Sequence, residues 1–134
     1  MKILMSGGSR FFGALVARRL LDAGHEGGAF HRGTSSNPIL PEIEHVLDPR
    51  AGHPVIEFPD RILRDWDVVI HMVAMGEDDA KAAVSAFEGR ASRFVMISSC
   101  DVYRAYGRLI KSEPGAPEPV PLDEDAPLRS VLYP

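Results

Sequence analysis

The sequence predicts an α/β fold in which a doubly wound parallel β-sheet of about five strands carries helices on both faces. Short apolar runs typical of strands alternate with segments of helical periodicity from the first residue onward. The segment 67–73 is dominated by β-branched and other apolar residues, as in a strand buried on both faces of a parallel sheet. A glycine-rich stretch, 7–13, joins the first apolar run directly to the first helical segment.

The first strand is expected over 2–6, where an apolar run ends at two glycines. A helix is expected over 11–23, and Gly24 stands where a left-handed residue usually caps a helix. The face of this helix that we expect to pack on the sheet carries Phe12, Val16 and Leu20, with Leu15 beside it.

The next elements are less regular. A second strand is expected over 25–31, although Gly27 and Gly28 contribute no side chain to pack. The segment 34–41 holds two prolines and no helical pattern, which indicates a loop. A third strand is expected over 43–47.

The second half of the sheet follows the same alternation. A short helix is expected over 59–65 with Ile62 and Leu63 facing inward, and the fourth strand is the segment 67–73. A helix over 77–89 carries three acids in its first turn, where the helix dipole favours them, and a fifth strand covers 93–98. A doubly wound sheet of this kind has the strand order 3-2-1-4-5, with a ligand crevice between strands 1 and 4.

Charge and proline divide the chain into two parts. The 134 residues carry a net charge of −4, and all of it lies in 112–134, which also holds six of the eleven prolines. We therefore expect a neutral domain over 1–111 followed by an acidic, proline-rich extended tail over 112–134. The negative charge makes nucleic acid an unlikely partner.

The compartment is predicted from what the sequence lacks. No apolar run reaches the length of a membrane span, and the N-terminus does not follow the pattern of a signal peptide. The single cysteine, Cys100, excludes an internal disulfide and suits a reducing compartment. These observations favour a cytoplasmic protein that contacts no membrane.

The glycine turn predicts a dinucleotide-binding site. Gly7 and Gly8 allow a tight turn, Gly13 allows the helix to pack closely on the strand, and amides at the helix start attract phosphate. Arg10 replaces the middle glycine of the usual pattern; its Cβ limits the approach of the backbone, and its guanidinium can compensate by pairing with phosphate. The candidate cofactor-binding residues of this turn are Gly7, Gly8, Ser9, Arg10, Phe11, Phe12 and Gly13.

The end of the second strand indicates the cofactor preference. NAD-binding sites usually place an acid there to accept hydrogen bonds from the ribose 2′-hydroxyl. This chain has Phe30-His31-Arg32-Gly33 instead, and Arg32 can pair with a 2′-phosphate. The sequence therefore favours NADP, with NAD as the alternative, and adds His31 and Arg32 to the candidate cofactor-binding residues.

Four segments in the expected order together resemble the NAD-dependent epimerase/dehydratase family, which are extended short-chain dehydrogenase/reductases. The likeness is strongest to an atypical branch that has arginine in the glycine turn. The four segments are GGSRFFG at 7–13, HRG at 31–33, DPR at 48–50 and SSCDVY at 98–103.

The resemblance implies an oxidoreductase that acts on a nucleotide-sugar-like or related small substrate. It places Asp48 beside the adenine and Val73, Ala74 and Met75 along the nicotinamide, although the family's motif at 73–75 is poorly kept. It makes Ser99 the catalytic residue that hydrogen-bonds the reacting substrate oxygen.

The family's acid/base pair, Tyr-x-x-x-Lys, is missing from this sequence. Four residues after Tyr103 stands Gly107, and four after Tyr106 stands Ile110. The expectation is an N-terminal portion of such an enzyme, truncated relative to the family and inactive alone, which needs a downstream region to act on a substrate.

Other interpretations stay open. The chain can be a non-catalytic module that senses dinucleotides or binds protein or RNA, or a fragment whose fifth strand is an open edge that drives self-association. Cys100 has no base near it in sequence, so we expect a packing or linker role. The five histidines share no metal-ligand spacing, so no metal site is predicted, and His71 is expected to be a core residue.

Overall fold

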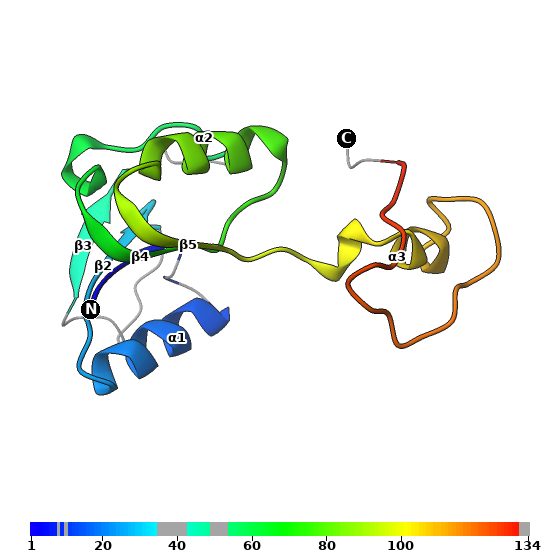
Figure 1. The fold of residues 1–134 in the computed structure, drawn as a ribbon, viewed down its shortest axis with the longest axis horizontal. Helices are drawn as coiled ribbons and strands as arrows, with labels where there is room; N and C mark the ends of the chain where they lie inside the picture. Colours follow the sequence, from blue (N-terminus) through cyan, green and yellow to red (C-terminus); the bar gives the residue numbers. More distant parts are fainter. Residues whose placement is uncertain (8, 10, 35–42, 49–53, 132–134) are drawn as a thin grey trace. The chain divides into compact units, whose positions relative to one another are not determined.

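The structure is a computed structural model that describes residues 1–7, 9, 11–34, 43–48 and 54–131. The chain divides into two compact units, Met1–Ile97 and Ser98–Pro134 (Figure 1). The sequence predicts a boundary after residue 111 instead. The predicted division into a domain over 1–111 and a tail over 112–134 concerns which residues fold as one unit, and it stays a prediction.

The first unit is built on a five-stranded parallel sheet with the predicted order, β3-β2-β1-β4-β5. Each predicted strand is present; the first has the predicted bounds, and the bounds of the other four shift by at most two residues. The strands are β1 (Lys2–Ser6), β2 (Glu26–His31), β3 (Glu44–Leu47), β4 (Trp66–His71) and β5 (Ala91–Met96). The predicted α/β fold class and doubly wound topology are therefore confirmed.

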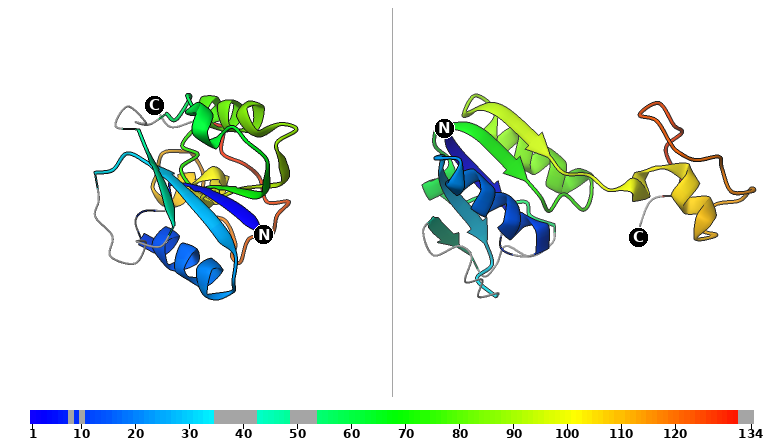
Figure 2. Two further views of the ribbon diagram at one scale, coloured as in Figure 1. Left: turned by 90° about the vertical axis from the view of Figure 1, so that its left-hand side faces the viewer. Right: turned by 90° about the horizontal axis from the view of Figure 1, so that it is seen from below.

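Two helices, α1 (Phe11–Asp22) and α2 (Glu77–Phe87), lie on opposite faces of this sheet (Figures 1 and 2). The expected helix over 59–65 is a single 3₁₀ turn, η1 (Asp60–Ile62), in which Ile62 is buried as predicted. Gly24 ends α1 as predicted: its φ is +78°, and its N–H donates to Leu21 O at 2.8 Å. None of the described helices is both long enough and apolar enough to cross a membrane.

The predicted inward face of α1 needs a correction. Phe12 and Leu15 are 43% and 60% exposed, while the fully buried side of the helix consists of Gly13, Ala14 and Ala17. Small residues allow the helix to lie close to the sheet, and the larger side chains then fall outside the contact. Val16 and Leu20 pack at its margin, as expected.

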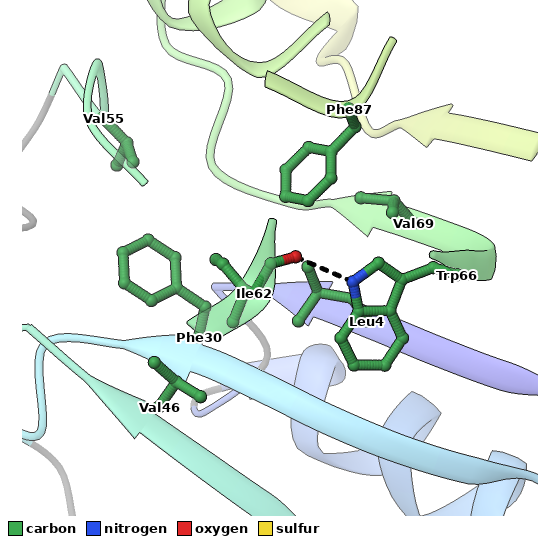
Figure 3. Packing of buried hydrophobic residues seen from close by; sticks show 8 residues of the cluster. All are labelled: Leu4, Phe30, Val46, Val55, Ile62, Trp66, Val69 and Phe87. Carbon is green, nitrogen blue, oxygen red and sulfur yellow. Dashed lines mark hydrogen bonds between the residues drawn. The ribbon is translucent and has the colours of Figure 1, made fainter. Parts of the chain in front are cut away.

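The core has one cluster on each face of the sheet. The α1 side contains Ile3, Met5, Ala14, Ala17, Ala29 and Ile43. The α2 side is larger and includes Trp66, whose indole N–H donates to Ile62 O at 2.9 Å, which links β4 to η1 (Figure 3). The cluster drawn in Figure 3 comprises Leu4, Phe30, Val46, Val55, Ile62, Trp66, Val69 and Phe87.

The second unit holds the 3₁₀ turn η2 (Cys100–Val102) and the short helix α3 (Arg104–Leu109). After α3 the chain folds back: Leu128 forms an antiparallel bridge with Tyr103, and Arg104 N–H donates to Pro127 O at 2.8 Å. This differs from the extended tail expected over 112–134. Backbone pairing and Glu113, described below, hold the proline-rich chain in a closed loop.

The buried indole predicts a measurable loss of stability. Trp66→Phe keeps most of the apolar contact but leaves the buried carbonyl of Ile62 without this donor, which costs about 1–3 kcal/mol. The free energy of unfolding, measured by circular dichroism in urea, should fall by that amount. Arg64→Ala is the control, because Arg64 lies over the ring at 4.6 Å but is exposed, and it should change stability by less than about 1 kcal/mol. Equal losses in both variants would contradict the importance of the indole hydrogen bond.

Candidate dinucleotide-binding site

The candidate site begins where β1 ends. Ser6 O accepts Met72 N–H at 2.9 Å, and Gly7 N–H donates to Phe30 O at 3.0 Å. β1 therefore stays hydrogen-bonded to the segments on both sides up to its last residue, and the chain then turns into α1. This is the point between strands 1 and 4 at which doubly wound sheets bind ligands.

Gly7 is required at this turn for two reasons. Its φ is +88°, a conformation that side chains rarely adopt, and a Cβ there would lie 2.3 Å from Val73 Cγ1. The backbone of the glycine turn thus lies directly against the segment that follows β4. Gly7 and Val73, which are predicted from the sequence to contact the pyrophosphate and the nicotinamide respectively, are neighbours.

The start of α1 suits an anion. Its first turn carries no acid, in contrast to the three acids in the first turn of α2, and Ser9 just before it is partly exposed. Phe11, the first helical residue, has φ +51° and is 89% exposed, with its ring in edge-to-face contact with Phe12. Gly13 is buried and allows the predicted close packing. The predicted residues Gly8 and Arg10 lie outside the described part of the chain.

The end of β2 carries no carboxylate. Arg32 is exposed, between His31 and Gly33, whose φ is +77°. The His31 side chain accepts Gly33 N–H at its Nδ1 (3.1 Å), and its Nε2 lies 2.8 Å from His45 Nδ1. Partial burial, with a smaller contribution from His45, lowers the pKa of His31.

The remaining predicted residues of the first unit lie around the same end of the sheet. Asp48 N–H donates to His31 O at 3.2 Å, which extends the pairing of β3 with β2. Val73 and Ala74 are half-buried after β4, and Met75 is 72% exposed. Pro49 and Arg50, which follow Asp48, lie outside the described residues.

Two residues near the site were not singled out from the sequence. Asp79 is fully buried, and its Oδ2 accepts Met75 N–H at 2.7 Å, so it fixes the loop between β4 and α2. In the sequence, Asp79 is one of three acids at the start of α2, all of which the helix dipole explains. The second residue is His45, because nothing in the sequence indicates that its side chain lies against that of His31.

Ser99, the predicted catalytic residue, belongs to the second unit. Its Oγ accepts Asp101 N–H at 3.3 Å and caps η2. Its catalytic role stays a prediction. The neighbouring Cys100 is an exposed free thiol.

His71 is completely buried, in ring contact with Phe58 and Phe94, as expected of a core residue. Within the described ranges, no group of three or more His, Cys, Asp or Glu side chains is arranged to hold a metal ion.

Comparison with known proteins identifies the fold. No family model and no curated protein matches the sequence. Among solved structures, the chain is similar to an NAD-dependent NDP-hexosamine 5,6-dehydratase of tunicamycin biosynthesis, with TM-score 0.70 and 23% identity over 96% of this chain and 43% of that one. It is also similar to the enzyme WbmG of Bordetella bronchiseptica in complex with NAD, with TM-score 0.68 and 18% identity over 98% of this chain and 44% of that one.

A third similar structure is a nucleoside-diphosphate-sugar epimerase from Pseudomonas aeruginosa, with TM-score 0.66 and 24% identity over 97% of this chain and 40% of that one. At these identities the likeness establishes a Rossmann-type fold. The chain spans less than half the length of each of these three proteins.

The Gly7 contact leads to a prediction about the turn. Gly7→Ala places a Cβ against Val73 and forces an alanine to positive φ, so it should destabilise the fold by about 1–3 kcal/mol. Gly7→Ala combined with Val73→Ala should recover part of the loss, because the clash is removed while the backbone strain stays. Urea denaturation of the single and double variants measures this. Additive losses would show that Val73 does not limit the turn.

Glu113 leads to a prediction about the second unit. Its Oε1 accepts the N–H groups of Val131 and Ser130 at 2.9 and 2.6 Å, and these bonds, that to Val131 first, lower the pKa of Glu113 below its usual 4.5. A lowered pKa adds stability above about pH 4.5, and this stability is lost as the pH falls through the folded-state value. Amide exchange at Ser130 and Val131 should therefore accelerate in acid, after correction for the intrinsic rate.

Glu113→Gln removes the charge but keeps an oxygen acceptor. In this variant the acid-dependent part of the protection should disappear. An unchanged pH dependence in Glu113→Gln would contradict the assignment to this carboxylate.

Proposed function

We propose that the chain is the dinucleotide-binding part of an NAD(P)-dependent oxidoreductase of the epimerase/dehydratase type. The observation that carries the proposal is the close turn at Gly7, which leads from the central strand into an acid-free helix start at the ligand-binding end of the sheet. The similar structures named above include an NAD-dependent dehydratase and an enzyme crystallised with NAD, and they support the proposal.

The residues present fit a dinucleotide. Gly7, Ser9 and the start of α1 would hold the pyrophosphate, with Gly8 and Arg10 proposed to complete this contact from outside the described residues. Asp48 would lie on the adenosine side, and the loop Val73–Met75 on the nicotinamide side. When bound, the nicotinamide supplies the hydride donor or acceptor. The chain's own part is to bind and orient it.

We propose NADP as the preferred cofactor. Arg32 is exposed at the end of β2 and follows a histidine rather than an acid, so its guanidinium is available to a 2′-phosphate. NAD is the alternative, and it is the cofactor named for two of the three similar structures.

We propose that catalysis needs residues that this chain does not contain. Nucleotide sugars or related compounds are the proposed substrates, since an NDP-hexosamine dehydratase and a nucleoside-diphosphate-sugar epimerase are among the similar structures. Ser99 is the proposed hydrogen-bond donor to the substrate, but the sequence holds no Tyr-x-x-x-Lys pair to move the proton. We propose that the chain is inactive alone, resides in the cytoplasm and self-associates through β5, one of the two edge strands of the sheet.

Calorimetric titration with NADPH and NADH tests the cofactor proposal. We expect NADPH to bind more tightly, and Arg32→Ala to weaken NADPH binding about tenfold or more through the loss of charge-assisted hydrogen bonds, with NADH little affected. Arg19→Ala, an exposed arginine in the last turn of α1, is the charge-matched control and should leave both affinities unchanged. Absence of binding by both dinucleotides would overturn the proposed function, and equal losses for both in Arg32→Ala would overturn the NADP preference.

A further inference from the structure

His31, at the end of β2, and His45, on β3, form a hydrogen-bonded pair. The sequence predicts that His31 contacts the cofactor, and the proposed function gives neither histidine a contact with it. β2 and β3 pair in register with Ala29 opposite His45, so His31 lies two positions further along, on the same face of the sheet. The two imidazole rings meet nearly at right angles, with centroids 5.1 Å apart. His31 is partly buried between this partner and its own turn.

The hydrogen bonds determine where the protons of the pair lie. Gly33 N–H donates to His31 Nδ1 at 3.1 Å, so Nδ1 is the unprotonated acceptor and the proton of the neutral ring is on Nε2. That Nε2–H then donates to His45 Nδ1 at 2.8 Å. The two hydrogen bonds therefore run in one direction, from Gly33 N–H to His31 and from His31 to His45. This direction defines one tautomer for each ring.

These two hydrogen bonds close the turn that carries Arg32. The bond from Gly33 N–H to the side chain two residues earlier is the geometry of an Asx turn, with imidazole Nδ1 in place of an asparagine oxygen. Gly33 has φ +77°, and a Cβ there would lie 3.4 Å from Leu47 Cδ1, so the turn rests against the end of β3. Arg32 is the exposed residue between the two bonded positions.

We infer that His31 and His45 are positioning residues for Arg32: the imidazole pair holds the turn 31–33 so that the Arg32 guanidinium faces the 2′-phosphate of the dinucleotide. This rests on the proposed function and deepens it. His31 acts through the backbone of its own turn rather than by touching the cofactor, and His45, on the adjacent strand, fixes the tautomer that His31 needs to accept the Gly33 amide.

Substitutions at His31 test whether the acceptor matters. His31→Leu removes the acceptor for Gly33 N–H, while His31→Asn places an oxygen acceptor near the position of Nδ1 and restores the turn as an Asx turn. We expect His31→Leu to weaken NADPH binding about three- to tenfold with NADH binding changed less than about twofold, and His31→Asn to restore the NADPH preference. His25→Gln, at the residue just before β2, is the control and should leave both affinities unchanged.

His45 supplies a second test, because the pair should act as a unit. His45→Leu should reduce the NADPH preference, and the double variant His31→Leu/His45→Leu should be no worse than His31→Leu alone. Additive losses would overturn the inference.

Exchange of the Gly33 amide, measured by NMR without ligand, tests the positioning independently of the cofactor. It should be faster in His31→Leu than in the parent chain and slowed again in His31→Asn, and equal rates in all three would overturn the inference.

If the parent chain shows the protected amide but binds neither dinucleotide, the proposed function fails, and with it the role toward the phosphate. If it prefers NADPH but His31→Leu keeps that preference, the inference alone fails. A His31→Leu chain that does not fold leaves the decision to His45→Leu, whose unchanged preference for NADPH would also overturn the inference.

Discussion

The contact between Gly7 and Val73 determines how the end of the sheet proposed to bind the dinucleotide is built. β1 is the central strand, and its last backbone groups are bonded to the segments on either side before the chain leaves the sheet. Because Gly7 has no side chain, the departing turn can lie against Val73 and lead straight into α1. A larger residue would push the turn away from β4, and the start of α1 would move with it.

Much of this arrangement was predictable because it depends on local patterns. Strand runs, the glycine turn and the acids of α2 each occupy a few consecutive residues, and the order of a doubly wound sheet follows from their alternation. The packing of α1 was less predictable. Its contact with the sheet uses Gly13, Ala14 and Ala17, which periodicity arguments based on large apolar residues overlook.

The features that sequence reasoning missed depend on pairs distant in the chain. His31 and His45 meet because β2 and β3 pair in one particular register, and a shift of one residue would send His45 to the other face. Glu113 reaches the amides of Ser130 and Val131 across a proline-rich loop whose composition indicates an extended chain. Likewise, nothing in the sequence distinguishes Asp79, which accepts the Met75 amide, from the other acids at the start of α2.

The aromatic residues are divided between the two units in a useful way. The only tryptophan, Trp66, is buried in the core of the first unit, whereas all three tyrosines of the sequence fall within the second. Excitation at a wavelength that only tryptophan absorbs therefore produces fluorescence from the first unit alone. Tyrosine fluorescence originates in the second unit. The order in which the two units lose structure during unfolding can thus be followed in the unmodified chain, without an added label.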